Sequence, residues 1–187
     1  MKITLYFTSI FLLITSLVSC NSQDDEFYDS IYLSRNNMIY IDTQTSYNVG
    51  DFLAVSASFS RYFAESTSFE MLDLYKTSNT NKFFFNYNLE KLNNGVWEKV
   101  EVNTLTNYYL MQGDVVFGEY ISGICVLNTV TNSYEFRGAI TLTESGSYRM
   151  YVGNEINSLN SSEQGINVNI KTTVTPITNS NYTFSVN

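Results

Sequence analysis

Residues 53–60 read Leu-Ala-Val-Ser-Ala-Ser-Phe-Ser, in which apolar side chains alternate with small or polar ones. Successive side chains of a β-strand point to opposite faces of its sheet, so this alternation predicts a strand with one apolar and one polar face. Such strands are typical of antiparallel sheets, which pack one face on a core and expose the other. The stretch therefore predicts a half-buried strand of an antiparallel sheet.

The same alternation recurs further along the chain. Residues 83–90 and 134–142 repeat it with larger aromatic and aliphatic side chains. Residues 93–95, Asn-Asn-Gly, predict a hairpin turn after the first of these, because Asn and Gly tolerate the positive φ that such turns require. The returning strand carries Trp97, the one tryptophan of the chain.

Other segments are less regular. Residues 31–33 and 38–41 predict a first pair of short strands around a turn at Asn36-Asn37. Residues 61–81 fit either a strand or a helical turn that ends in a loop, and residues 154–165 predict a polar loop. About nine or ten strands without a long helix predict an all-β domain, a sandwich or a barrel, over residues 31–187.

Residues 142–150 read Leu-Thr-Glu-Ser-Gly-Ser-Tyr-Arg-Met. This segment resembles the acidic-x-Gly-x-Tyr corner that precedes the penultimate strand of immunoglobulin-like domains. The resemblance implies a single immunoglobulin-like antiparallel β-sandwich, in which the Tyr148 hydroxyl bonds to backbone a few residues upstream. Met150 stands where an antibody domain has its second cysteine, which excludes the disulfide-bonded version. A jelly roll is the alternative fold, and Tyr148 and Trp97 are the predicted structural residues.

Residues 1–19 have the features of a bacterial signal peptide. Lys2 supplies the positive charge and residues 3–18 supply the apolar stretch. That stretch is shorter than the ~20 residues that span a bilayer, which argues against a transmembrane helix. Residues 17–20, Leu-Val-Ser-Cys, resemble the lipobox of bacterial lipoproteins. The resemblance implies cleavage of the signal peptide before Cys20 and lipidation of its thiol.

An acidic segment follows the cysteine directly, with Gln23, Asp24, Asp25 and Glu26. It resembles the export signal of surface lipoproteins of Bacteroidota, although charge clusters are also typical of solvated linkers. The resemblance implies a lipidated, flexible tether over residues 20–30. It also implies an outer-membrane lipoprotein that faces the cell exterior and contacts the membrane through its N-terminal lipid.

The composition argues against catalysis, metal binding and nucleic-acid binding. The chain has no histidine, 18 acidic residues and 10 basic ones, and a formal net charge of −8. It therefore lacks the commonest general base and the commonest transition-metal ligand, and no basic stripe offers a surface to nucleic acid. Cys125 lies among Ile, Val and Leu, which predicts a buried side chain rather than a nucleophile. We expect no enzyme activity, no cofactor and no metal site.

Glu90 and Glu98 flank the predicted hairpin and could meet across it. Two carboxyl groups at a set separation carry out glycoside hydrolysis. Two solvated strand residues are the simpler interpretation of this pair, and we expect that one.

The aromatic residues offer the main indication of binding. The chain has 15 Tyr and 13 Phe, and strand alternation sends some of them to outer faces, where flat rings can stack on sugars. The candidate ligand-binding residues are Tyr62, Phe84, Tyr109 and Tyr151. They predict a non-catalytic ligand-binding or adhesion module whose partner is a glycan or another surface protein. The alternative is a structural subunit that docks on an outer-membrane complex through a sheet edge.

Residues 29–31, Asp-Ser-Ile, fit the acceptor pattern associated with periplasmic O-glycosylation in Bacteroidota. Ser30 is therefore a candidate glycosylation site, placed where an enzyme could reach it.

Lipidation and export can be tested together. Cys20→Ala should leave an unprocessed or soluble form, because signal peptidase II and acyl transfer both need that thiol. Replacement of Asp24, Asp25 and Glu26 by Ala should keep the protein lipidated but protect it from external protease. Lipid labelling and protease shaving of intact cells measure the two effects. Shaving of the triple variant at the wild-type rate would show that the acidic segment is not an export signal.

Overall fold

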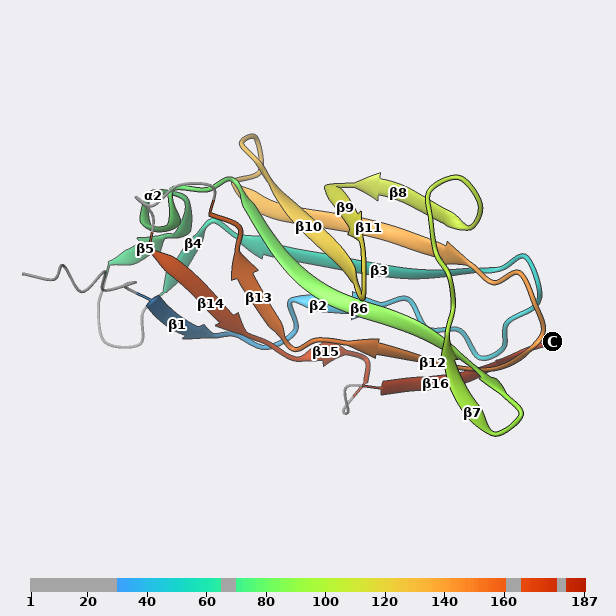
Figure 1. Cartoon of the computed structure of the whole chain (residues 1–187). Coiled ribbons are helices and arrows are strands. Elements are labelled where there is room, and N and C mark those ends of the chain that lie inside the picture. The colour runs from blue at the N-terminus through green and yellow to red at the C-terminus, as the bar shows by residue number, and fades with distance from the viewer. Residues whose placement is uncertain (1–29, 65–69, 161–165, 178–180) are drawn as a thin grey trace, which may run out of the picture.

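The computed structural model describes residues 30–64, 70–160, 166–177 and 181–187 (Figure 1). Within these ranges the chain forms sixteen strands, β1 to β16, and one short helix, α2 (Leu74–Ser78). The predicted all-β class is therefore confirmed. No helix in the described ranges has the length and apolar character needed to cross a bilayer. The predicted signal peptide, residues 1–19, and the tether up to residue 29 lie outside the described residues.

One group of strands faces the viewer in Figure 1 and is called the front layer below. Its neighbouring strands follow the order β1 (Ser30–Ser34), β14 (Asn167–Lys171), β13 (Glu155–Ser158), β6 (Lys82–Asn93) and β10 (Ile121–Asn128). Further strands extend this layer by pairing with β6, β12 or β10, and they are β12 (Gly146–Val152), β7 (Val96–Lys99), β16 (Asn181–Val186) and β9 (Asp114–Phe117).

A second group packs behind it and is called the back layer. It consists of β8 (Tyr108–Gln112), β11 (Ser133–Thr141), β3 (Phe52–Ser60), β2 (Ile39–Ile41) and β15 (Val174–Thr175), in that order. A separate two-stranded sheet, β4 (Tyr62–Ala64) and β5 (Met71–Asp73), lies with α2 at one end of the molecule (Figure 1).

Aromatic rings from the two layers meet in the core. The Phe83 ring of β6 lies 4.7 Å from Tyr134 of β11 and 5.6 Å from Phe59 of β3, measured between centroids. Phe85 packs edge-on against Phe136 at 5.4 Å. These rings are at most 5% exposed, and they come from the three stretches whose alternation predicts buried faces. The predicted strands and their inward faces are therefore confirmed.

The two layers belong to one continuous, curled sheet. β10 and β11 pair only near their shared turn, from Val126 to Asn128 against Ser133 to Glu135. Beyond that point β10 continues along β6 and β9, whereas β11 continues along β3 and β8. The sheet thus folds over on itself, and its two halves form a sandwich-like pair of layers.

Gly138 leaves room for a pair of tyrosines that joins the two layers. The hydroxyls of Tyr87 and Tyr108 share a buried hydrogen bond of 2.6 Å, and burial raises the pKa of Tyr87 well above its usual value. A Cβ at Gly138 would lie only 1.9 Å from the Tyr108 hydroxyl oxygen. Glycine is required there because any larger side chain would displace the tyrosine pair that joins the layers.

The first two strands do not pair with each other, so the expected hairpin at residues 36–37 is wrong. β1 instead runs parallel to β14, and β2 runs parallel to β15. The Asn37 N–H donates to Thr173 Oγ1 at 2.9 Å, which holds the β1–β2 link against the β14–β15 link. Both links pass from the front layer to the back layer together. The sheet is consequently mixed, rather than purely antiparallel as predicted.

One segment that the sequence leaves open takes a definite form, and one predicted loop is wrong in part. Residues 71–78 form β5 and then α2, and the Asp73 side chain caps the helix by accepting from the Lys76 N–H. Residues 155–158, expected to be part of a polar loop, form β13. The turn at residues 93–95 is confirmed, with positive φ at Asn94 and Gly95 between β6 and β7.

The Tyr148 side chain lies where β12 begins. Its ring is 3% exposed and stacks on Phe184 of β16 at 5.7 Å. Its hydroxyl donates to the Glu144 carbonyl oxygen at 2.8 Å. Met150, two residues further on, is fully buried. The corner segment therefore ties the start of β12 to the preceding turn.

Tyr148→Phe should lower the free energy of unfolding by about 1 kcal/mol through loss of the hydrogen bond, and Tyr148→Ala by several more through lost packing. Urea denaturation measures both changes. Tyr151→Phe on the same strand is the matched control, because Tyr151 is 39% exposed and its hydroxyl makes no hydrogen bond within the described residues. Equal stability of Tyr148→Phe and wild type would contradict a structural role for this bond.

Candidate ligand-binding site

The front layer splits beside β6. β12 pairs with β6 from Tyr148 to Val152, and β13 pairs with β6 at Asn157 and Ser158. Between these two strands the chain bends at Gly153, whose N–H donates to the Asn86 carbonyl at 2.8 Å. A Cβ on Gly153 would lie 3.2 Å from that oxygen. On the side away from β6, β12 pairs with β16, whereas β13 pairs with β14. The two strands therefore separate at the bend, and the sheet has an opening there.

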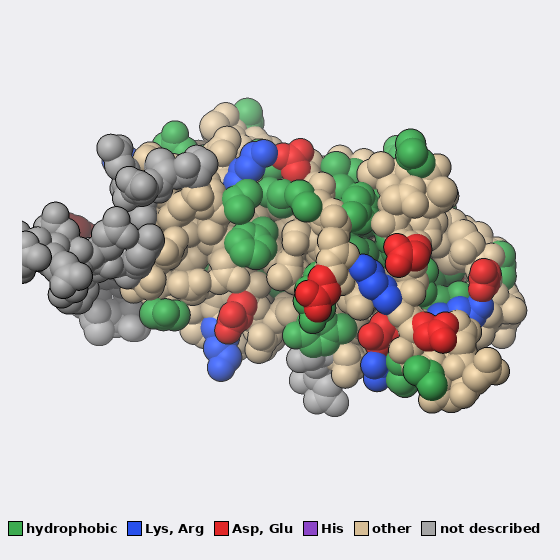
Figure 2. Space-filling view, in the orientation of Figure 1, with side chains coloured by type: hydrophobic (Ala, Val, Ile, Leu, Met, Phe, Trp, Pro, Cys, Tyr) green, Lys and Arg blue, Asp and Glu red, His purple; other side chains and the backbone are tan. Residues whose placement is uncertain are grey.

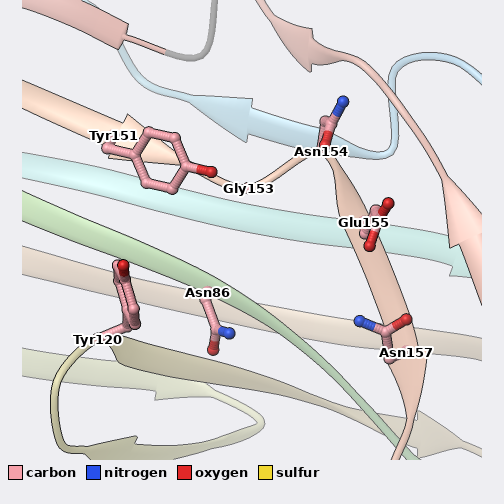
Figure 3. A pocket seen from close by; sticks show the side chains of 7 residues that line it. All are labelled: Asn86, Tyr120, Tyr151, Gly153, Asn154, Glu155 and Asn157. Atoms are coloured by element: carbon pink, nitrogen blue, oxygen red, sulfur yellow. The ribbon is translucent and has the colours of Figure 1, made fainter.

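A hollow of about 270 Å³ lies at this opening on the outer face of the front layer. Two tyrosines and three asparagines line it together with one carboxylate, and they are Tyr120, Tyr151, Asn86, Asn154, Asn157 and Glu155. In Figure 3 the two rings lie on one side, the side chains of Asn154, Glu155 and Asn157 lie on the other, and Asn86 lies between them. The hollow thus combines flat apolar surface with hydrogen-bonding groups.

The polar groups of this hollow are mostly unpaired. Within the described residues, no hydrogen bond or ion pair involves the side chains of Tyr120, Tyr151, Asn154, Glu155 or Asn157. Asn86 uses its Oδ1 to accept from Ser122 at 2.7 Å, which leaves its amide nitrogen available. The Tyr120 and Tyr151 side chains are 42% and 39% exposed. These groups are therefore available to a ligand.

Other polar side chains of the domain are satisfied by the protein itself. The Glu135 carboxylate accepts from Ser133, Asn128, Thr131 and Gln112, and these bonds, that of Ser133 first, lower its pKa. Glu144 pairs with Lys91 in the same way. The contrast with the hollow is informative because unpaired groups that share one concave surface are typical of binding sites.

Asn88 adds a buried acceptor to this region. It is 9% exposed and lies opposite Tyr151 in the β6–β12 register. Its Oδ1 has no hydrogen-bond partner within the described part of the chain. An unpaired buried acceptor costs about 1–3 kcal/mol, so a ligand hydroxyl that reached it would relieve that cost.

The charge of the hollow limits the ligands it can accept. Glu155 is the one ionisable acid in the lining, and neither Lys nor Arg contributes to it. Such a surface disfavours anions, since no cation is available to neutralise them. It suits uncharged molecules that carry both hydroxyls and a flat apolar face. The lining holds no second carboxylate of the kind that glycoside hydrolysis needs.

The structure places the four predicted ligand-binding residues at three locations. Tyr151 lines the hollow, and Phe84 lies beside it on the same outer face, opposite Asn157 in register. Tyr109 lies on β8 of the back layer, 63% exposed. Tyr62 lies on β4 at the end of the molecule. Only Tyr151 and Phe84 are brought together.

Tyr120 and the asparagines are absent from the sequence-based candidates. Tyr120 precedes β10, and its carbonyl accepts from the Gly118 N–H at 3.0 Å, which closes the turn after β9. The polar face of residues 83–90 contains Asn86 and Asn88. Amides on a strand flanked by aromatic residues are the signal that could have indicated the site.

Tyr62 belongs to a cluster around Arg61. The Arg61 guanidinium donates to both carboxylate oxygens of Asp73, at 2.7 and 2.6 Å. It also lies 5.3 Å from the Tyr62 ring centroid and 5.0 Å from that of Tyr75. Because the guanidinium forms an ion pair with Asp73, this cluster joins β4, β5 and α2 rather than presenting an unpaired charge.

Glu90 and Glu98 do not meet. In the β6–β7 register Glu90 lies opposite Lys99 and Glu98 lies opposite Lys91, so the two carboxylates point to opposite faces. Glu90 binds Arg149, and Glu98 accepts from Asn93 Nδ2 at 2.7 Å. The guanidinium of Arg149 lies 4.7 Å from the Trp97 ring centroid. Trp97 is thus half-buried on β7, outside the main core.

The remaining predicted residues are also placed. Cys125 is fully buried on β10, and burial raises the pKa of its thiol. Ser30 is exposed and is the first residue of β1. In the described ranges, no group of three or more Cys, Asp or Glu side chains could hold a metal ion. Cys20 and residues 23–26 lie outside the described residues.

Comparison with protein-family models and with curated protein sequences yields no match to this chain. The interpretation of the hollow therefore depends on its own geometry and chemistry.

The Arg61–Asp73 pair should make stability depend on pH. Bonds from Arg61 hold the pKa of Asp73 below its usual value of about 3.9. An acid with a lowered folded-state pKa stabilises the fold above its unfolded pKa and loses that contribution as the pH falls through its folded pKa. Asp73→Asn should cost about 2 kcal/mol near neutral pH, and this difference should shrink in acid.

Urea denaturation at about pH 7 and about pH 3 measures this change. Asparagine can still cap α2, so the variant isolates the charge. Glu119→Gln, at an exposed carboxylate outside every ion pair of the described residues, is the matched control. A cost for Asp73→Asn that is equal at both pH values would exclude ionised Asp73 as the source.

Proposed function

We propose that the protein is a non-catalytic surface lipoprotein whose β-domain binds a neutral, hydroxyl-rich ligand of the glycan class in the hollow beside β6. One observation carries the proposal: two half-exposed tyrosines face a set of unpaired amides and one carboxylate. Rings stack on the apolar faces of sugars, and amides both donate to and accept from sugar hydroxyls. A pocket that orients its ligand through a few polar groups has this form.

The N-terminal sequence supports the location of this module. A lipid on Cys20 would anchor the chain, and the acidic residues 23–26 would direct it to the cell surface. The module would then face ligands outside the cell. The β1 strand begins at Ser30, shortly after this anchor.

Docking through a sheet edge is the rival function. Docking of this kind needs a long, uncovered edge strand with which a strand of the partner can pair. The two ends of the main strand path are short, with five residues in β1 and two in β15. Aromatic and amide groups gather instead on one outer face, which favours ligand binding.

We also infer a distant relationship to immunoglobulin-like domains. The Tyr148 hydroxyl bond to the Glu144 carbonyl supports it, because that bond is the hallmark of the tyrosine corner. The parallel β1–β14 and β2–β15 pairs would then be additions at the edges of such a sandwich.

The binding proposal predicts dependence on two rings. Tyr151→Ala and Tyr120→Ala should each weaken binding of the purified protein to neutral oligosaccharides about tenfold, through loss of one packed aromatic contact. An oligosaccharide array followed by calorimetry measures the change. Affinity should also survive added salt, because stacking on a neutral ligand does not depend on charge, whereas contacts between exposed charges more than about 8 Å apart are screened at physiological ionic strength.

Tyr40→Ala is the matched control. Tyr40 is 41% exposed, close to the value for both pocket tyrosines, but it lies on β2 of the back layer. Binding that weakens equally in all three variants, or that disappears with salt, would contradict the proposed site.

A further inference from the structure

A row of side chains leads from the hollow to the edge of the front layer. Asn157 of β13 lies opposite Asn169 of β14, and Asn169 lies opposite Tyr32 of β1. Residues paired across strands point to the same face of a sheet. Their neighbours along the strands, Ile156 and Val168, are fully buried. The row therefore lies on the outer face, together with the hollow.

The side chains of this row make no hydrogen bonds in the described ranges, and they are half-buried at Asn157 and Asn169 and exposed at Tyr32. Tyr32 is 79% exposed, more than any other tyrosine among the exposed large side chains of the described residues. No hydrogen bond of the Asn157, Asn169 or Tyr32 side chains occurs in the described ranges. In Figure 2 the surface over β13 and β14 is mostly tan, that is, uncharged polar groups and backbone, with acidic and basic side chains at its lower end. This surface offers hydrogen-bonding amides that end at an exposed ring.

The opposite direction along the face is chemically different. From Tyr151 along β12 toward β7, the next outward group is Arg149, which pairs with Glu90 and covers the Trp97 ring. These groups are already engaged with one another. Figure 2 likewise shows charged side chains gathered toward that end of the molecule. Of these two directions, the one toward β1 offers the row of unpaired side chains in the described part of the chain.

The length of the row indicates how long a ligand must be to contact all of it. From β13 to β1 there are two strand spacings, about 10 Å in all. A single sugar in the hollow cannot reach Tyr32, whereas a linear chain of sugars can. Amides at successive strands and a ring at each end suit a repeating polymer of hydroxyl-bearing units.

We infer that the hollow holds one part of a linear neutral oligosaccharide whose chain continues across β13 and β14 to stack on Tyr32. This inference depends on the proposed function and specifies its substrate class as an extended chain rather than a single sugar. Tyr151 and Tyr120 contact the unit in the hollow, Asn157 and Asn169 hydrogen-bond to the units that follow, and Tyr32 contacts the distal unit.

The test uses ligand length. The full-length protein is titrated with glucan, mannan, xylan and galactan oligosaccharides, from disaccharide to hexasaccharide. Tyr32→Ala should weaken hexasaccharide binding about tenfold and leave disaccharide binding unchanged. Asn169→Ala should show the same dependence on length, whereas Tyr32→Phe, which keeps the ring, should bind as wild type does. Tyr109→Ala, an exposed tyrosine of the back layer, is the matched control.

The possible failures can be told apart. If Tyr151→Ala weakens every length while Tyr32→Ala and Asn169→Ala weaken none, the hollow binds sugars but the extended row is refuted. Equal loss for disaccharide and hexasaccharide in Tyr32→Ala also refutes it, because Tyr32 would then not be a distal contact. If no oligosaccharide binds the wild-type protein, the proposed function itself fails.

Discussion

The packing of alternate β6 side chains against the back layer is the constraint on which the rest of the structure depends. Phe83, Phe85 and Tyr87 reach across to β3 and β11, and this fixes the opposite set, including Asn86, as outward-facing. A register slip of one residue would exchange the two sets. The outer face of the front layer is therefore specified by the core, and the core rings hold the hollow in place although they do not line it.

The parts of the fold that the sequence predicts correctly are those that depend on neighbouring residues alone. Residues 53–60 and 83–90 alternate regularly, and the turn at residues 93–95 needs only residues with positive φ, so both are visible in the sequence. The pairing of β1 with β14 joins residues more than a hundred positions apart. No local signal encodes such a pairing, since either strand would be equally regular beside another partner.

The site shows the same division. Tyr151 and Phe84 could be found from alternation, because each is the outward residue of an aromatic-rich strand. Tyr120 comes from a tight turn, and Asn157 comes from a strand inside a segment that the sequence predicts to be a polar loop. They meet because β10, β12 and β13 all pair with β6. That sharing is a property of the assembled sheet and cannot be deduced from either segment alone.

The parallel pairing of β1 with β14 has a mechanical consequence. β1 begins at Ser30, so if Cys20 carries the proposed lipid, a pull from that anchor would act along β1. Five register pairs between β1 and β14 would bear that load together, in shear, rather than opening one after another. A ligand held over β13 and β14 would apply the opposing force one or two strands away. Tension between the cell and a bound polymer would thus cross a narrow strip of the sheet, and the aromatic core would remain unloaded.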